Sequence, residues 1–162
     1  MRYVLAVLLV SALLAWWTLP TRRPRVGDIE ADRTNISELE QRFGPGQKHS
    51  DWEIYSWRER DGPYSLRVIL SNSGTVSHLE YGVLEGTEDA PAVDLKLDLP
   101  AGLQFGDDLA TAQHILGEEG SLVGERPGVA SYNFTDCWDT PRTFGQLRFV
   151  DGKLTKIYFR ID

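Results

Sequence analysis

Cysteine is almost absent from this chain: Cys137 is the single one among 162 residues. A lone cysteine forms no intramolecular disulfide and no cysteine-based metal site, so a disulfide-stabilised scaffold is excluded. Three histidines are present, and none follows the spacing with which zinc or another transition metal is held in known motifs. We therefore expect no metal and no cofactor.

Recognisable catalytic motifs are also missing. The chain has no phosphate-binding glycine loop, no dinucleotide-binding glycine motif and no serine-nucleophile elbow. Asp136 and Asp139 flank Cys137, and their negative charges disfavour the thiolate that a cysteine nucleophile needs. We expect that the protein is not an enzyme. A small envelope enzyme, with a base beside His114 or Cys137, is kept as an alternative.

Positive charge is scarce beyond the first 25 residues. Four of the 17 basic residues lie in residues 1–25, which contain no acidic residue. Residues 26–162 therefore carry 13 basic against 24 acidic residues, a net charge of −11. An acidic domain repels phosphate backbones, so we expect no nucleic acid as a partner. Another protein is expected instead, and a basic one suits the surface charge.

One long apolar run is present, at residues 3–19, and it contains no charged residue. Its length is at the short end of what spans a bilayer and slightly long for the apolar region of a signal peptide. Trp16 and Trp17 suit a membrane interface, and three arginines come after them. The best candidate cleavage site would cut inside the run. We expect residues 1–20 to form an uncleaved single-pass anchor, with a cleaved signal peptide as the alternative.

The side of the membrane on which the rest of the chain lies is a separate question. Arg2 precedes the apolar run and three arginines come after it, which by the positive-inside count would place the domain in the cytoplasm. Short N-terminal spans more often export the domain C-terminal to them. We expect a cell-membrane protein with an extracytoplasmic, periplasmic domain. Secretion after cleavage and a cytoplasm-facing domain are the alternatives.

Periodicity divides the remaining chain into two similar units. Residues 21–33 are expected to be a linker, residues 34–86 a first α-β-β-β unit, residues 87–104 a connecting strand and residues 105–162 a second such unit. Gly44 and Gly117 are each expected to end a helix, and the segments 74–81 and 152–159 match with glycine and three apolar positions aligned. The predicted fold class is α+β: two tandem α-β-β-β units forming an antiparallel sheet with helices on one side, behind the N-terminal helix.

Aromatic residues occur outside the expected core positions. If Ile54 faces the core, the strand period places Tyr55 and Trp57 on the opposite face, and in the last strand Tyr158 and Arg160 oppose the apolar positions. Tyr, Trp and Arg carry much of the binding energy in protein interfaces. The candidate partner-binding residues are Tyr55, Trp57, Trp138, Tyr158 and Arg160. The alternative is that the aromatics pack beneath loops or against the other unit.

The order of elements resembles a known superfamily. Each unit combines a helix that ends near Phe-Gly or Leu-Gly, aromatic strands and a hairpin that closes on glycine; the matching segments are 39–44, 52–57 and 74–81, then 105–108, 115–117 and 144–159. One such unit resembles the small lipoprotein of the outer-membrane β-barrel assembly machinery, and two in tandem resemble the β-lactamase-inhibitor proteins. The chain lacks the lipid-acceptor cysteine of the first and the paired cysteines of the second.

The resemblance implies a non-catalytic domain that binds another protein through its sheet and loops. We therefore expect a membrane-anchored, extracytoplasmic protein-binding module of the bacterial envelope, either an adaptor or an assembly accessory. An immunity or inhibitor protein that neutralises a toxin or hydrolase is the first alternative. The sequence leaves the identity of the partner and the oligomeric state open.

Overall fold

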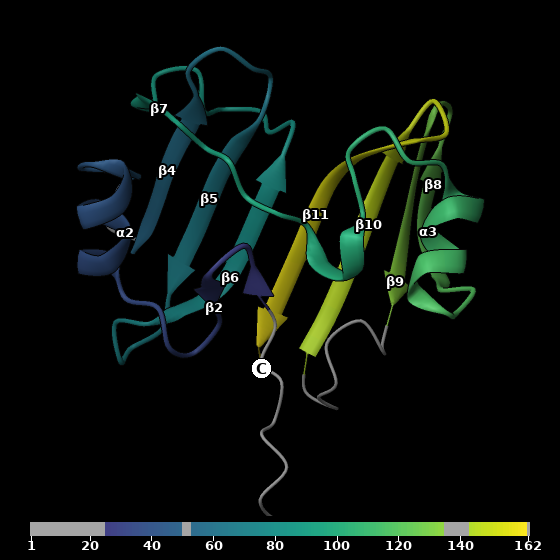
Figure 1. Ribbon diagram of the computed structural model, residues 1–162, viewed down its shortest axis with the longest axis horizontal. Coiled ribbons are helices and arrows are strands. Elements are labelled where there is room, and N and C mark those ends of the chain that lie inside the picture. The colour runs from purple at the N-terminus through teal and green to yellow at the C-terminus, as the bar shows by residue number, and fades with distance from the viewer. Residues whose placement is uncertain (1–24, 50–52, 135–142, 162) are drawn as a thin grey trace, which may run out of the picture.

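The computed structural model describes residues 25–49, 53–134 and 143–161 (Figure 1). Its helical elements are α2 (Ile36–Phe43), α3 (Leu109–Leu116) and the 3-10 turn η1 (Pro100–Gly102). Its strands are β1 (Arg25–Val26), β2 (Ile29–Glu30), β3 (Gln47–His49), β4 (Ile54–Glu59), β5 (Ser65–Leu70), β6 (Val76–Gly82), β7 (Ala92–Val93), β8 (Ser121–Arg126), β9 (Val129–Phe134), β10 (Thr143–Val150) and β11 (Lys153–Ile161).

One large sheet dominates the fold. Its strand order is β3-β4-β5-β6-β11-β10-β9-β8, and neighbours along this path are antiparallel. β7 pairs with β4 in parallel, and β1 and β2 form a separate hairpin. The predicted α+β class with an antiparallel sheet is confirmed. Within the described ranges no helix is long and apolar enough to cross a membrane, and the run at residues 3–19 lies outside those ranges.

The two halves of the sheet have the same order of elements. In each half one helix is followed by four strands, and the last strands, β6 and β11, pair at the centre of the sheet. In each half, the residue before the helix also forms an isolated β-bridge near the start of the last strand of that half. Asn35 pairs with Thr75 near β6, and Asp108 pairs with Lys153 of β11. The sequence predicts three strands in each half, so β3 and β8, at the two ends of the strand order, are additional.

Both helices begin at a side-chain cap and end at the glycine that the sequence predicts, Gly44 for α2 and Gly117 for α3. The Asn35 side chain accepts from the Glu38 amide at 3.1 Å, and the Glu38 carboxylate accepts from the Asn35 amide at 3.0 Å, which is a capping box. The Asp108 side chain accepts from the Thr111 amide at 2.8 Å. Gly117 ends α3 in the left-handed conformation, which glycine adopts without steric cost.

The core lies on one face of the sheet and is centred in the first half on Trp57. This side chain is 0% exposed, its ring centroid lies 6.0 Å from that of Phe43 on α2, and its indole nitrogen donates to the Gly44 carbonyl at 2.9 Å. A Cβ atom on Gly46 would lie 2.6 Å from the Trp57 ring. The indole can pack at this position because residue 46 is a glycine and has no side chain. The expectation that Trp57 lies on an exposed face is wrong, because α2 packs on its side of β4.

Two connecting segments differ from their predicted roles. The described part of the expected linker, residues 25–33, forms the β1–β2 hairpin, in which Val26 and Ile29 are buried. Of the expected connecting strand only Ala92–Val93 is a strand; residues 94–99, which we call the crossing segment, then cross the core face of the sheet to η1 (Figure 1). Leu95 and Leu97 are buried there, so the alternating pattern reflects packing onto a sheet face rather than pairing within the sheet.

The edge strand β8 is exposed along its whole length. Leu122 and Val123 are 51% and 49% exposed, and a register shift between Leu122 and Gly124 marks a bulge in its pairing with β9. β8 is the end of the strand order, and the sequence does not predict it because its residues lack regular apolar alternation.

Replacing Trp57 with alanine is expected to lower the free energy of unfolding by about 3–5 kcal/mol, since a buried indole and its hydrogen bond are lost. Urea denaturation measures the change. Tyr158→Ala, which removes a half-buried ring from the opposite face, is the control and is expected to cost much less. A Trp57→Ala variant as stable as the unmodified protein would contradict the packing described.

The two helix caps are expected to differ in their pH dependence. Hydrogen bonds from Thr111, the backbone amide foremost, hold the pKa of Asp108 below its ordinary value of 3.8. The ionised Asp108 side chain therefore contributes its full stabilisation to the folded protein above the ordinary pKa, which applies to the unfolded chain. This contribution is lost as the pH falls through the lower pKa of the folded protein. Chemical denaturation should show that the destabilisation by Asp108→Ala vanishes in acid. The destabilisation by Asn35→Ala, about 1 kcal/mol, should persist because the side chain of residue 35 does not titrate.

Candidate functional site

One face of the sheet carries no helix among the described residues. α2, α3, the β1–β2 hairpin and the crossing segment all contribute to a core cluster on the other face. Side chains alternate between the faces of a strand, so the cross-strand register identifies those that point away from the core. Ser131, Arg148, Lys156 and Gly82 form one row of this open face across β9, β10, β11 and β6.

The open face is basic although the domain is acidic. Glu80 is the one carboxylate that the described strands place on it, in register with Arg67 and Tyr158. Seven cationic side chains share the face with it: Arg58, Arg67, Arg126, Arg148, Lys153, Lys156 and Arg160. The net charge of −11 is therefore unevenly distributed, and its sign does not describe this surface.

A network of ion pairs lies at the centre of the open face. Glu80 accepts from Arg67 at 3.1 Å and from Lys156 at 3.3 Å, and its side chain is 23% exposed. In the described part of the chain no carboxylate lies within ion-pair distance of the half-buried Arg148 guanidinium, which is in register with Lys156 on β10. One carboxylate thus faces three partly desolvated cations, an arrangement that favours a further anion.

A loop covers one end of the open face. After β6 the chain runs through residues 83–91, which we call the lip. The Arg67 guanidinium donates to the Glu85 carbonyl at 2.7 Å, and Arg58 Nε donates to the Ala90 carbonyl at 3.0 Å. The Thr87 hydroxyl donates to the Ser65 hydroxyl at 2.9 Å, and both residues are buried. These bonds fix the lip over the ends of β4 and β5.

A hollow of about 420 Å³ lies between the lip and the ends of β9 and β10. It is lined by Arg67, Glu80, Val83, Leu84, Glu85, Val129, Arg148, Val150, Thr155 and Lys156. A second hollow, of about 350 Å³, shares Val129, Arg148 and Lys156 with the first and extends to Gly124 and Arg126 on β8. The two hollows adjoin at these three residues, and together we call them the depression.

The structure separates the predicted site residues. Tyr158 and Arg160 lie on the open face, with the Tyr158 ring centroid 6.3 Å from that of His78. Tyr55 lies on the core face beside Trp57, with ring centroids 6.5 Å apart, so its predicted placement is wrong for the same reason as that of Trp57. Trp138 lies outside the described residues. A role in partner binding remains a prediction for Tyr158 and Arg160.

Tyr81, on the core face, has a strongly displaced pKa. Burial, the largest cause, and the nearby Glu59 carboxylate raise the pKa of Tyr81 to about 12. Its hydroxyl donates to the Leu95 carbonyl at 3.0 Å, and a phenol that stays protonated retains this bond at every physiological pH. Tyr81 therefore secures the crossing segment rather than contributing to the open face.

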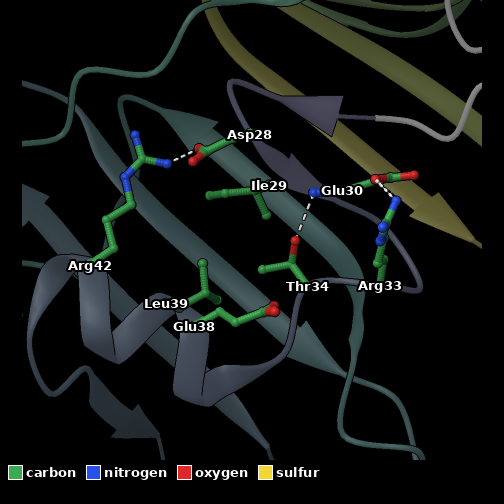
Figure 2. A pocket seen from close by; sticks show the side chains of 8 residues that line it. All are labelled: Asp28, Ile29, Glu30, Arg33, Thr34, Glu38, Leu39 and Arg42. Atoms are coloured by element: carbon green, nitrogen blue, oxygen red, sulfur yellow. Dashed lines mark hydrogen bonds and ion pairs between the residues drawn. The ribbon is translucent and has the colours of Figure 1, made fainter.

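Another pocket lies between the β1–β2 hairpin and α2, with a volume of about 310 Å³ (Figure 2). Its charged groups are engaged with one another or with the backbone: Arg42 pairs with Asp28, Arg33 with Glu30 at 3.3 Å, and the Glu38 carboxylate accepts from the helix cap. Since the Arg42–Asp28 pair joins α2 to the hairpin and the other two interactions are local, we interpret the pocket as a packing junction.

A serine and a histidine also lie within hydrogen-bond distance on the open face. His49 Nε2 is 2.8 Å from the Ser56 hydroxyl. Ser56 is 0% exposed, so its hydroxyl is out of reach of a substrate. The described ranges contain no group of three or more His, Cys, Asp or Glu residues that could hold a metal ion, and Cys137 lies outside them.

Comparison with known proteins adds the fold alone. No family model and no curated protein matches the chain. The chain is similar to the crystal structure of a DUF4309 family protein, YjgB, from Bacillus subtilis, with a TM-score of 0.55, 12% sequence identity and 88% of each chain covered. This likeness shows a related sheet-rich arrangement. It does not support the superfamily that the order of elements resembles.

Glu80→Gln is expected to change stability and anion binding in opposite directions. The substitution leaves Arg67 and Lys156 without their counter-charge, which should cost about 1–3 kcal/mol of unfolding free energy. The same loss should strengthen the binding of a synthetic polyglutamate peptide to the open face, measured by fluorescence anisotropy at low salt. Glu85→Gln, at the exposed rim, is the stability control. Weaker peptide binding by Glu80→Gln would contradict an anion site beside this carboxylate.

Proposed function

We propose that this protein is a membrane-anchored, extracytoplasmic protein-binding module of the bacterial envelope that holds an acidic segment of its partner on the open face of the sheet. The observation that carries the proposal is the reversal of charge: the described strands place seven cations and one carboxylate on the open face of a domain with a net charge of −11. The net charge alone favours a basic partner; the surface favours an acidic one.

The distribution of charge favours a protein segment over a long polyanion. A nucleic acid or an anionic membrane surface extends well beyond the open face and would approach the acidic remainder of the domain, which repels it. A short acidic segment can lie within the depression around Arg148 and Lys156 and avoid that repulsion. Half-buried cations interact more strongly with such a segment than fully hydrated ones do.

The side chains of the depression suit binding rather than catalysis. Its polar groups are guanidinium, ammonium, amide and hydroxyl groups with the carboxylates of Glu80 and two rim residues. The cationic, amide and hydroxyl groups donate hydrogen bonds and the carboxylates accept them, as in the rim of a protein interface. The proposed attachment to the membrane depends on the apolar run at residues 3–19, and the outward orientation on the behaviour of short N-terminal spans.

Arg148→Glu is expected to weaken partner binding at least tenfold, because it replaces an attractive contact with a repulsive one inside a partly desolvated site. The matched control is Lys96→Glu, the same change of charge at a highly exposed position of the crossing segment. A photo-reactive amino acid at residue 146, on the open face, should form cross-links in intact cells at an acidic stretch of one protein, and Arg148→Glu should remove them.

Cross-links that form from residue 96 but not from residue 146 would contradict the proposed surface. Adducts with lipid in place of protein, together with binding of the purified chain to vesicles of anionic phospholipid, would identify a membrane surface as the occupant instead. A C-terminal reporter that is active only outside the cytoplasm tests the orientation.

A further inference from the structure

The hollow beneath the lip has two chemically different walls. On one side are the cations Arg67, Arg148 and Lys156, joined through Glu80. Four aliphatic side chains make up the hydrophobic lining: Val83 and Leu84 belong to the lip, and Val129 and Val150 lie at the strand ends opposite it. The acidic groups of the hollow are Glu80, which is already paired, and Glu85 at the rim. The cationic wall therefore adjoins a hydrophobic one within a single volume of about 420 Å³.

The aliphatic wall is accessible to a ligand. Val83 is 50% exposed, which is among the highest values for large apolar side chains in the described residues, and it stands on the lip opposite the strand ends. The Val83 amide donates to the Thr155 carbonyl at 2.9 Å, so the backbone of the lip is fixed to β11 at this position. An exposed aliphatic side chain on a fixed backbone offers a contact that requires little ordering upon binding.

The register sets the spacing between the two walls. Arg148 and Val150 lie two residues apart on the same face of β10, and the pairing of β10 with β9 is regular through this stretch. Two residues of a strand span about 6.6 Å. In an extended peptide, side chains i and i+2 lie on the same side at the same separation. An extended partner segment along β10 can therefore present one side chain to each wall.

We propose that this hollow is a specificity subsite for an acidic residue followed or preceded, two positions away, by an aliphatic residue. The carboxylate binds Arg148 and Lys156, and the aliphatic side chain packs on Val83, Val129 and Val150. The proposal rests on the proposed function, because it names the sequence feature by which the acidic partner is recognised. It commits the segment to an extended conformation, in contrast to a helix, whose i and i+2 side chains diverge.

Synthetic peptides test the spacing on the full-length chain in detergent micelles with methyl-labelled valines. The probe is Gly-Ser-Glu-Ser-Leu-Ser-Gly, compared with one peptide in which serine replaces leucine and one in which leucine comes directly after glutamate. We expect the probe to bind about three- to tenfold more tightly than either, since a partly buried aliphatic side chain contributes on that scale. The methyl signals of Val83 and Val150 should shift with the probe.

Val83→Ser and Val123→Ser form a matched pair of variants. Both side chains are about half exposed, at 50% and 49%, and Val123 lines neither hollow. Val83→Ser should remove the advantage of the leucine peptide and leave the binding of the leucine-free peptide unchanged. Val123→Ser should leave both affinities unchanged.

Equal affinities for the three peptides, all weakened by Arg148→Glu, would overturn the subsite and leave the proposed function standing. If the probe binds more tightly than both comparison peptides while neither Val83→Ser nor Val123→Ser reduces this difference in affinity, the placement of the subsite in this hollow is overturned. If no peptide binds and residue 146 forms no cross-link to an acidic protein, both the subsite and the proposed function are overturned.

Discussion

The pairing of β6 with β11 is the interaction on which the rest of the structure depends. It joins two halves, each too small to bury a sufficient core alone, into one sheet with a common core cluster. On the core face it places Leu79 opposite Phe159, and both are fully buried. On the open face it brings Glu80 within ion-pair distance of Lys156, so the same pair of strands forms the cationic centre. Stability and the candidate site thus have one origin.

Local signals in the sequence predict much of the fold. Capping residues locate both helices, and the glycine-anchored match between residues 74–81 and 152–159 corresponds to β6 and β11, the pair at the centre of the sheet. The phase of β4 is not predicted, because Ile54 points to one face of the strand and Tyr55 and Trp57 point to the other, and only the position of α2 decides which of the two faces is the core face. β8 and the β1–β2 hairpin are too short or too irregular to show a periodic pattern.

The candidate site is less predictable than the fold, and the reason is electrostatic. A sum over the sequence counts every charge equally, whereas strand alternation and register sort the charges between two faces. Tyr158 and Arg160 can be placed on the open face from the last strand alone. Arg67, Glu80 and Arg148 become neighbours only when four strands are aligned, and the lip that completes the hollow depends on hydrogen bonds from Arg58 and Arg67 to distant carbonyls.

The bulge in β8 has a consequence for the behaviour of the protein in solution. An unprotected edge strand presents its backbone groups to any other strand, and continued pairing of that kind leads to fibres. Here the edge is interrupted at Gly124, beside the charges of Glu125 and Arg126, so a second strand cannot continue the ladder without a mismatch. Leu122 and Val123 are thus exposed at a margin of the sheet where the irregularity of the strand disfavours the addition of further strands.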